Sequence, residues 1–103
     1  MTQVTMKHWI DGQEVVEDGV DVVDIVSPTT GAVIGGVCEA SVELVERAIA
    51  SAQRAQKEWA QMSLARRTAV LFRFRNLIVE HRDELAATIA REGGKTLGDA
   101  DGE

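Results

Sequence analysis

The sequence is poor in the residue types that build disulfides, metal sites and base-stacking surfaces. Its single cysteine, Cys38, excludes an intramolecular disulfide, and the two histidines, His8 and His81, do not complete the spaced Cys/His set of a structural zinc site. Tyrosine is absent and only 4% of the residues are aromatic, which argues against a platform for stacking nucleic-acid bases. We therefore expect none of these three features.

Long apolar runs and an excess of basic charge are also missing. Residues 1–10 contain no apolar run of signal-peptide length, and no later run approaches the length needed to cross a bilayer. Eleven basic against seventeen acidic residues give a formal net charge of −6 at pH 7, which repels nucleic-acid phosphates and anionic membranes. We expect a cytoplasmic protein without nucleic-acid or membrane partners. A chain of 103 residues suits one modest domain or part of a larger one.

The first 40 residues have the pattern of β-structure. Asp11-Gly12 is the pair that a two-residue type I′ turn needs, so it predicts a tight hairpin near the start of the chain. A β-branched run, a turn and a returning strand follow, at Val20–Val26, Ser27–Gly31 and Val33–Cys38. Gly35 and Gly36 within the last strand indicate a bulge or a close backbone approach.

From residue 41 onward the apolar period becomes helical. Ser41 is a candidate N-cap, Ser63 starts a second helix that reaches about His81, and Asp83 can cap a third helix that ends at a left-handed Gly93. The apolar stripes of the first two helices are Val45, Ala48, Ile49, Ala52 and Trp59, and Val70, Leu71, Phe74, Leu77 and Ile78. The expected fold class is α/β, with an N-terminal β-hairpin and strands followed by about three helices.

The segment Gly93-Gly94-Lys95-Thr96 resembles the end of a phosphate-binding loop. Such a loop requires a further glycine five residues before Gly94, between a strand and a helix, but that position is Ile89 in a helical pattern. A double-glycine helix stop followed by an exposed lysine explains the segment better. Gly31–Gly36 likewise lacks the spacing of a dinucleotide fingerprint. We therefore reject nucleotide-triphosphate hydrolysis.

No residue in the chain has the surroundings of a catalytic group. Cys38 ends an apolar strand without an identifiable base, so we expect a buried structural cysteine. Neither His8 nor His81 belongs to a recognisable pair with a nucleophile or carboxylate. A basic cluster could contact a phosphate or an acidic partner, although a solvated or salt-bridged helix face is commoner. It consists of Arg66, Arg67, Arg73 and Arg75.

Five segments occur in an order that resembles the N-terminal region of aldehyde dehydrogenases. In chain order they are Trp9-Ile10-Asp11-Gly12, Ser27–Gly31, Glu58-Trp59, Leu71–Arg75 and Glu92–Thr96. The resemblance spans essentially the whole chain. Within the superfamily, Arg82–Leu85 followed by Gly94–Glu103 is most similar to the CoA-acylating methylmalonate-semialdehyde dehydrogenase group.

This resemblance implies that residues 1–103 are an incomplete part of the cofactor-binding domain of an α/β enzyme, β-rich over 1–40 and helical over 41–103. It implies NAD and CoA as cofactors of the complete parent, which would oxidise methylmalonate or malonate semialdehyde to an acyl-CoA. The family's catalytic cysteine, general-base glutamate, oxyanion-binding asparagine and main nicotinamide contacts all lie beyond Glu103, and Cys38 does not match the nucleophile motif. We therefore assign no catalytic, cofactor-binding or metal-ligating side chain.

Two details of the resemblance concern individual positions. Some relatives bind a monovalent cation through main-chain oxygens near the positions of Val26 and Glu92, which implies a cation site there. Relatives usually carry asparagine before the proline of the turn, where this chain has Ser27. Serine can still form a local hydrogen bond, so we expect the turn itself to persist.

Three hypotheses follow. The first is an N-terminal fragment of an NAD-dependent aldehyde dehydrogenase, inactive by itself, whose parent is a homo-oligomer. The second is a stand-alone, non-catalytic interaction or oligomerisation domain that associates through exposed apolar helix faces. The third is an independent phosphate or nucleotide binder that uses Gly93–Thr96.

Overall fold

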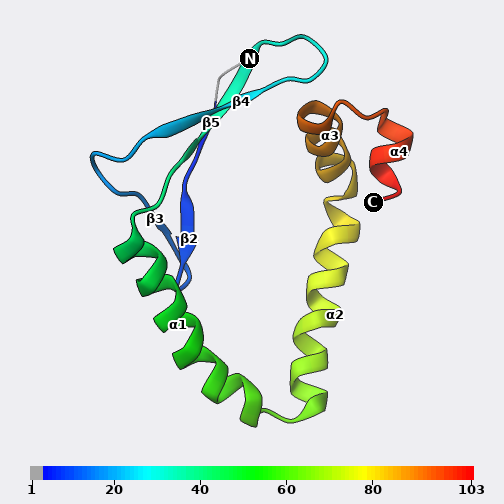
Figure 1. Cartoon of the computed structure of the whole chain (residues 1–103). Helices are drawn as coiled ribbons and strands as arrows, with labels where there is room; N and C mark the ends of the chain where they lie inside the picture. The colour runs from blue at the N-terminus through cyan, green and yellow to red at the C-terminus, as the bar shows by residue number, and fades with distance from the viewer. Residues whose placement is uncertain (1–3) are drawn as a thin grey trace. The chain divides into compact units, whose positions relative to one another are not determined.

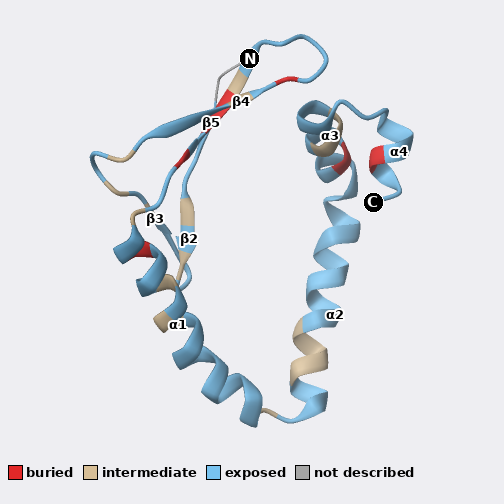
Figure 2. Ribbon diagram, in the orientation of Figure 1, coloured by how far each residue is buried: buried red, intermediate tan, exposed pale blue. Residues whose placement is uncertain are grey.

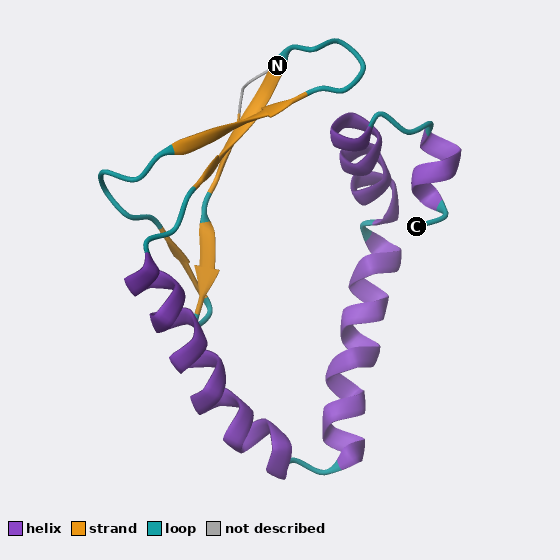
Figure 3. Cartoon of the chain, in the orientation of Figure 1, coloured by secondary structure: helices purple, strands orange, loops and turns teal. Residues whose placement is uncertain are grey.

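The computed structural model describes residues 4–103 (Figure 1). These residues divide into two compact units. The first unit contains the residues up to Val26 together with Val33–Gln61, and the second contains Ser27–Ala32 together with Met62–Glu103. All strands in the described part precede residue 39 and all helices follow residue 41 (Figure 3), so the expected α/β class is confirmed. No helix there is both long and apolar enough to cross a bilayer. The assignment of residues 1–103 to one domain stays a prediction.

A three-stranded sheet forms the centre of the first unit. Its strands are β1 (Val4–Met6), β4 (Val22–Val26) and β5 (Val33–Cys38), in the order β1-β5-β4. The central strand β5 pairs parallel with β1 and antiparallel with β4. The β-branched run and the returning strand are therefore confirmed, while the short strand β1 was not predicted because three residues carry too little pattern.

Both glycines of β5 lie where another chain segment approaches the backbone. A Cβ atom on Gly35 would be 2.7 Å from the carbonyl oxygen of Val4, and one on Gly36 would be 2.7 Å from Cγ1 of Val22. The pairing with β4 also shifts register between Ile25 and Val26. The strand thus has both the irregularity and the close approach that its glycines indicate.

A two-stranded hairpin completes the β-structure of the first unit. Strand β2 (His8–Ile10) pairs antiparallel with β3 (Gln13–Val15). The two turn residues both have positive φ, 55° at Asp11 and 73° at Gly12. This is the backbone that a type I′ turn requires, so the predicted hairpin is confirmed.

Helix α1 (Val42–Gln61) follows the sheet and begins at the predicted N-cap. The Ser41 hydroxyl accepts a hydrogen bond from the backbone N–H of Leu44 at 3.1 Å. Leu44 is the buried side chain of this helix, whereas Val45 and Ile49 of the predicted stripe are exposed. The period located the helix correctly, but only the packing against the β-structure decides which side chain is covered.

The second unit contains three helices: α2 (Leu64–Glu80), α3 (Arg82–Gly93) and α4 (Leu97–Asp101). The predicted start of α2 at Ser63 is confirmed, and the Ser63 hydroxyl caps the helix by accepting a hydrogen bond from the N–H of Arg66. The predicted cap of α3 is wrong, since His81 takes the N-cap position and Asp83 lies in the first turn. Asp83 still complements the positive end of the helix there.

Two further corrections concern the end of the chain. The left-handed residue that closes α3 is Gly94, with φ 71°, and not Gly93, which is still helical. The short helix α4 was not expected, although Thr96 caps it by accepting a hydrogen bond from the N–H of Asp99. A threonine followed three residues later by an acid was the available signal.

The turn between β4 and β5 packs against the C-terminal end of α3 within the second unit. Ser27, which is buried, donates its N–H to the carbonyl of Ala32, and its own carbonyl accepts from Gly31. Its hydroxyl accepts from the N–H of Thr30 at 3.4 Å, so the local hydrogen bond expected of serine is present. Pro28 is close enough that a Cβ on Gly94 would lie 2.9 Å from its Cγ.

The described chain buries few large side chains (Figure 2). The buried apolar residues are Cys38 and Leu44 in the first unit and Ala86 and Ala100 in the second, and α2 contains no buried residue. The accessible surface is 8180 Å². Two compact proteins of half its mass would together expose roughly 6,900 Å². Each unit therefore leaves apolar surface that its own residues do not cover.

Replacing Gly94 tests the packing of the turn on α3. We expect Gly94→Ala to destabilise the second unit by about 1–2 kcal/mol, because alanine is strained at positive φ, and the contact with Pro28 adds to this. Gly93→Ala is the matched control: Gly93 is helical and has open space around its Cα, so about 0.5–1 kcal/mol of stabilisation is expected. Urea unfolding followed by circular dichroism measures both. Equal midpoints for the two variants would contradict the packing.

Candidate functional site

A carboxylate from the loop after β3 is bound at the N-terminus of α1. Glu17 Oε1 accepts the backbone N–H of Ser41 at 2.9 Å, and Oε2 accepts its hydroxyl at 2.6 Å. The same hydroxyl oxygen accepts the N–H of Leu44. Two of the N–H groups at the helix start are therefore satisfied, and the β-rich segment is joined to the helix.

These contacts also determine the charge at the helix start. The hydrogen bond from the Ser41 hydroxyl, followed by that from its backbone N–H, lowers the pKa of Glu17 below its usual value, and the nearby His8 adds to the shift. An ionised carboxylate at this position complements the positive end of the helix dipole. It also repels a phosphate, so the N-terminus of α1 is unsuited to hold a dinucleotide pyrophosphate.

The Gly93–Thr96 segment connects two helices. Ile89, at the position where a phosphate loop requires glycine, lies inside α3, and the Thr96 hydroxyl is used to cap α4. Lys95 forms an ion pair with Glu103. A phosphate loop follows a strand, whereas this segment follows a helix, so the geometry agrees with the helix-stop interpretation.

An ion pair joins the start of α3 to the end of α4. The Arg82 guanidinium binds Asp101 through two nitrogens, with Nη2 2.7 Å from Oδ2 and 3.3 Å from the backbone oxygen. The hydrogen bonds from Arg82 lower the pKa of the Asp101 carboxyl, and Asp101 in turn raises the pKa of Arg82. Both side chains are partly exposed, so the pair orients α4 and does not resemble a desolvated catalytic pair.

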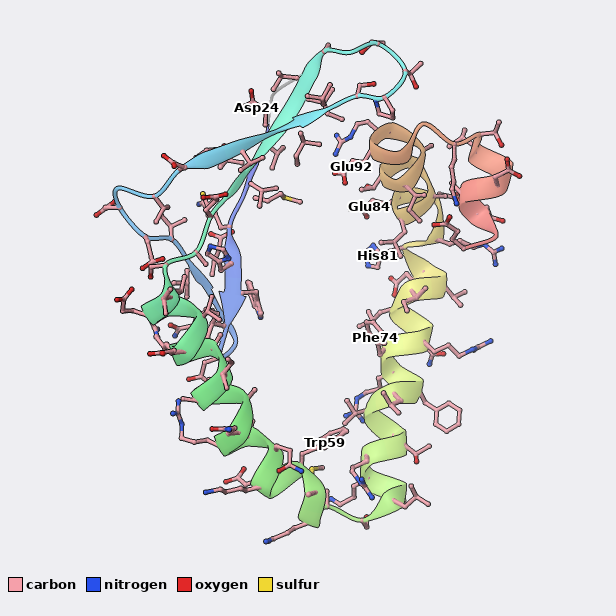
Figure 4. All side chains as sticks on the ribbon, in the orientation of Figure 1. Asp24, Trp59, Phe74, His81, Glu84 and Glu92 are labelled. Carbon is pink, nitrogen blue, oxygen red and sulfur yellow. The ribbon has the colours of Figure 1, made fainter. Side chains whose placement is uncertain are left out.

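The three candidate nucleophile and base residues do not come together. Cys38 is buried at the end of β5, as expected of a structural cysteine. His8 Nε2 lies 3.3 Å from the carbonyl oxygen of Glu39, whereas His81 Nδ1 lies 3.1 Å from a carboxylate oxygen of Glu84 (Figure 4). The expectation that neither histidine has a carboxylate partner is therefore wrong for His81. This pair is exposed and local to one helix turn, and no hydrogen bond in residues 4–103 links it to a nucleophile.

The basic cluster lies on α2 without acidic partners. No ion pair within residues 4–103 involves Arg66, Arg67, Arg73 or Arg75. Arg75 donates to the side-chain oxygen of Asn76 at 3.5 Å. Except for the partly buried Arg67, these side chains are exposed, which agrees with a largely solvated helix side.

The described residues offer no evident metal or small-molecule site. No group of three or more His, Cys, Asp or Glu side chains within residues 4–103 is placed to hold a metal ion. The main-chain cation site expected near Val26 and Glu92 stays a prediction, since these residues belong to different units.

Three hollows lie in the described part of the first unit. One, of about 650 Å³, is bounded by residues of α1 alone, so it is the open side of one helix. The other two, of about 260 Å³ and 390 Å³, lie between the hairpin and α1, and both include Trp9 and Ile10 in their lining. The first of these two falls below the usual size of ligand sites, and neither has convergent charged groups.

Comparison with known proteins decides the family. Residues 15–103 match the family model described as the aldehyde dehydrogenase family. The chain belongs to the aldehyde dehydrogenase family. Malonate-semialdehyde dehydrogenase 3 of Geobacillus kaustophilus is 39% identical to it over 99 residues, which are 96% of this chain and 20% of that relative. The family resemblance inferred from the order of motifs is thus confirmed.

Solved aldehyde dehydrogenases contain the same fold. One is a candidate methylmalonate-semialdehyde dehydrogenase of Sinorhizobium meliloti 1021, solved with NAD, with 38% identity and a TM-score of 0.91. Another is the lactaldehyde dehydrogenase of Escherichia coli, with 35% identity and a TM-score of 0.91. The match covers 98% and 97% of this chain and 21% of each solved chain. This aldehyde dehydrogenase segment therefore spans about a fifth of the relatives that it matches.

Sequence reasoning missed the role of Glu17 in this aldehyde dehydrogenase segment. The residue is 24 positions from Ser41 and belongs to a loop, so no local pattern connects the two. Ser41 was recognisable as an N-cap, but its second partner depends on how the loop folds back. Only the tertiary structure shows that the Ser41 hydroxyl donates to Glu17 while it accepts from the N–H of Leu44.

Acid unfolding tests the Glu17 contacts. Because the pKa of Glu17 is lowered in the folded state, its contribution to stability is present above the unfolded pKa of about 4.3 and is lost as pH falls through the folded value. We expect Glu17→Gln to lower the urea midpoint at pH 7 and to differ less from the parent near pH 3. Asp18→Asn, an adjacent carboxylate with no such contacts, serves as the control. A Glu17→Gln difference that does not change with pH would contradict the assignment.

Proposed function

We propose that this chain is the N-terminal part of an NAD-dependent, CoA-acylating dehydrogenase that converts malonate or methylmalonate semialdehyde to an acyl-CoA. The observation that carries the proposal is the 39% identity, over 96% of this chain, to a malonate-semialdehyde dehydrogenase. The Sinorhizobium meliloti relative supports the same substrate class and NAD as the cofactor, because it was solved in complex with NAD. CoA acylation rests on the resemblance of Arg82–Leu85 and Gly94–Glu103 to the acylating group.

Within such an enzyme, residues 4–103 would have a structural role and not a catalytic one. Aldehyde oxidation through a thiolate requires a nucleophile, donors for the developing oxyanion and a bound nicotinamide to converge. Cys38 is buried and hydrogen-bonded to neither histidine. The residues around it do not match the motif that contains the nucleophilic cysteine of the family. We therefore assign no residue of this chain a role in the reaction, and the catalytic groups would come from other sequence of the enzyme.

The described residues do not fit NAD by themselves. The N-terminus of α1 holds the Glu17 carboxylate, and the paired glycines of β5 face other strand segments and not an open cradle. In the complete enzyme, bound NAD would supply the hydride acceptor for aldehyde oxidation. No step of that reaction is assigned to this chain, whose contribution is to position α1 and the sheet.

The proposal includes a cytoplasmic, homo-oligomeric enzyme. The uncovered apolar side chains of the described part support assembly with further protein surface. The negative net charge supports the absence of nucleic-acid and anionic-membrane partners.

An activity assay tests whether this chain is inactive by itself. We expect the purified 103-residue chain to give no NADH formation with NAD, CoA and malonate or methylmalonate semialdehyde, because it lacks the convergent groups described above. The complete Sinorhizobium meliloti relative, assayed in parallel, is the positive control. Turnover above a no-protein blank would overturn the prediction.

The exposed helix stripes favour a second candidate, a stand-alone oligomerisation domain. Val45 and Ile49 are 47% and 54% exposed, and Phe74 and Ile78 are 60% and 42% exposed. Under the enzyme proposal, the isolated chain has no evolved partner for these stripes. We then expect sedimentation to show a concentration-dependent range of sizes and no fixed stoichiometry. One discrete oligomer that persists on dilution would instead support the stand-alone domain.

A further inference from the structure

Helix α2 exposes large apolar side chains on two sides. Leu71, Phe74, Leu77 and Ile78 form one surface, which we call the Phe74 face. Phe72 and Val79 form a second surface, which we call the Phe72 flank. The rings of Phe74 and Phe72 are 60% and 63% exposed, and Figure 4 labels Phe74 on the helix.

The width of this apolar surface limits what can cover it. At 3.6 residues per turn, the six side chains from Leu71 to Val79 span roughly 220° of the circumference of the helix. A surface helix that covers one side of a core needs a stripe of about 100°, whereas these two surfaces together extend over about twice that width. Arg75 lies between the two surfaces, and the remaining strip of the helix carries Arg66, Arg73, Asn76 and Glu80, which suit solvent. The helix is therefore built for enclosure on two sides.

The comparisons indicate which polypeptide encloses it. The same segment occurs, with a TM-score of 0.91, in a solved chain of which it forms only 21%. A second copy of this chain laid along one side of α2 would leave the other side exposed, whereas the much longer remainder of a dehydrogenase is large enough to cover both. We propose that the Phe74 face and the Phe72 flank dock against the other four-fifths of an aldehyde dehydrogenase. This inference rests on the proposed function.

A chimera tests the docking directly. The region of the Sinorhizobium meliloti enzyme that matches this chain is replaced by residues 1–103, and the product is assayed for soluble protein and NAD-dependent oxidation of methylmalonate semialdehyde. Leu77→Asp probes the Phe74 face and Phe72→Asp probes the flank. Asn76→Asp is the matched control, because it places the same carboxylate on the adjacent solvent strip.

The expected result is at least a tenfold loss of soluble active chimera for Leu77→Asp and for Phe72→Asp, because a carboxylate enclosed in an apolar contact is strongly unfavourable. Asn76→Asp should retain the parental level. The same three substitutions in the isolated 103-residue chain should leave the helical circular dichroism unchanged, since all three positions are exposed there. Loss of helix in the isolated chain would show a role inside the segment and would overturn the docking inference.

The remaining outcomes separate this inference from the proposed function. An unsubstituted chimera that is insoluble or inactive would overturn the proposed function and the docking inference with it. An active chimera in which Leu77→Asp and Phe72→Asp behave like Asn76→Asp would overturn the docking inference alone. Loss on the Phe74 face without loss on the Phe72 flank would overturn enclosure on two sides.

Discussion

Helix α2 is the part of the molecule whose environment constrains every functional conclusion. Its backbone is complete and capped, yet it contains no buried side chain, and its largest apolar groups are exposed. Helix propensity and a cap can define where such a helix begins, but most helical stability in proteins comes from packing of the apolar side. The exposed apolar side chains of this helix agree with a segment that spans a fifth of the relatives that it matches.

The local contacts within each of the two units are mainly polar or steric, in contrast to the exposed apolar side chains of α2. In the first unit, Glu17 and Ser41 join the loop after β3 to the start of α1. In the second, the turn at Ser27 packs against the left-handed Gly94, and Arg82 holds Asp101. These contacts place polar and backbone groups accurately while burying little apolar area. Hydrogen bonds and steric limits thus specify the local contacts of the described residues, while most large apolar side chains stay exposed.

Family membership came from the order of structural motifs and from none of the groups that perform chemistry. The hairpin at Asp11-Gly12, the turn at Ser27–Gly31 and the helix stop at Gly93-Gly94 are all scaffold features, each with a conformational reason for its residues. Cys38 and the two histidines, the residue types that most often carry catalysis, proved to be a buried strand end, a ring beside the backbone oxygen of Glu39 and a ring paired with Glu84. Chain order was informative because several weak local signals had to agree.

The sequence by itself determined the elements whose causes are local. Positive φ at Asp11-Gly12, the caps at Ser41 and Ser63 and the apolar periods of the helices all depend on neighbours a few residues away. The tertiary structure decided what depends on distant residues: the burial of Leu44 and not Val45, the binding of Ser41 by Glu17, and the choice of Gly94 as the left-handed residue beside Pro28. Periodicity assigns a side chain to one side of a helix, but only the folded chain determines whether anything covers that side.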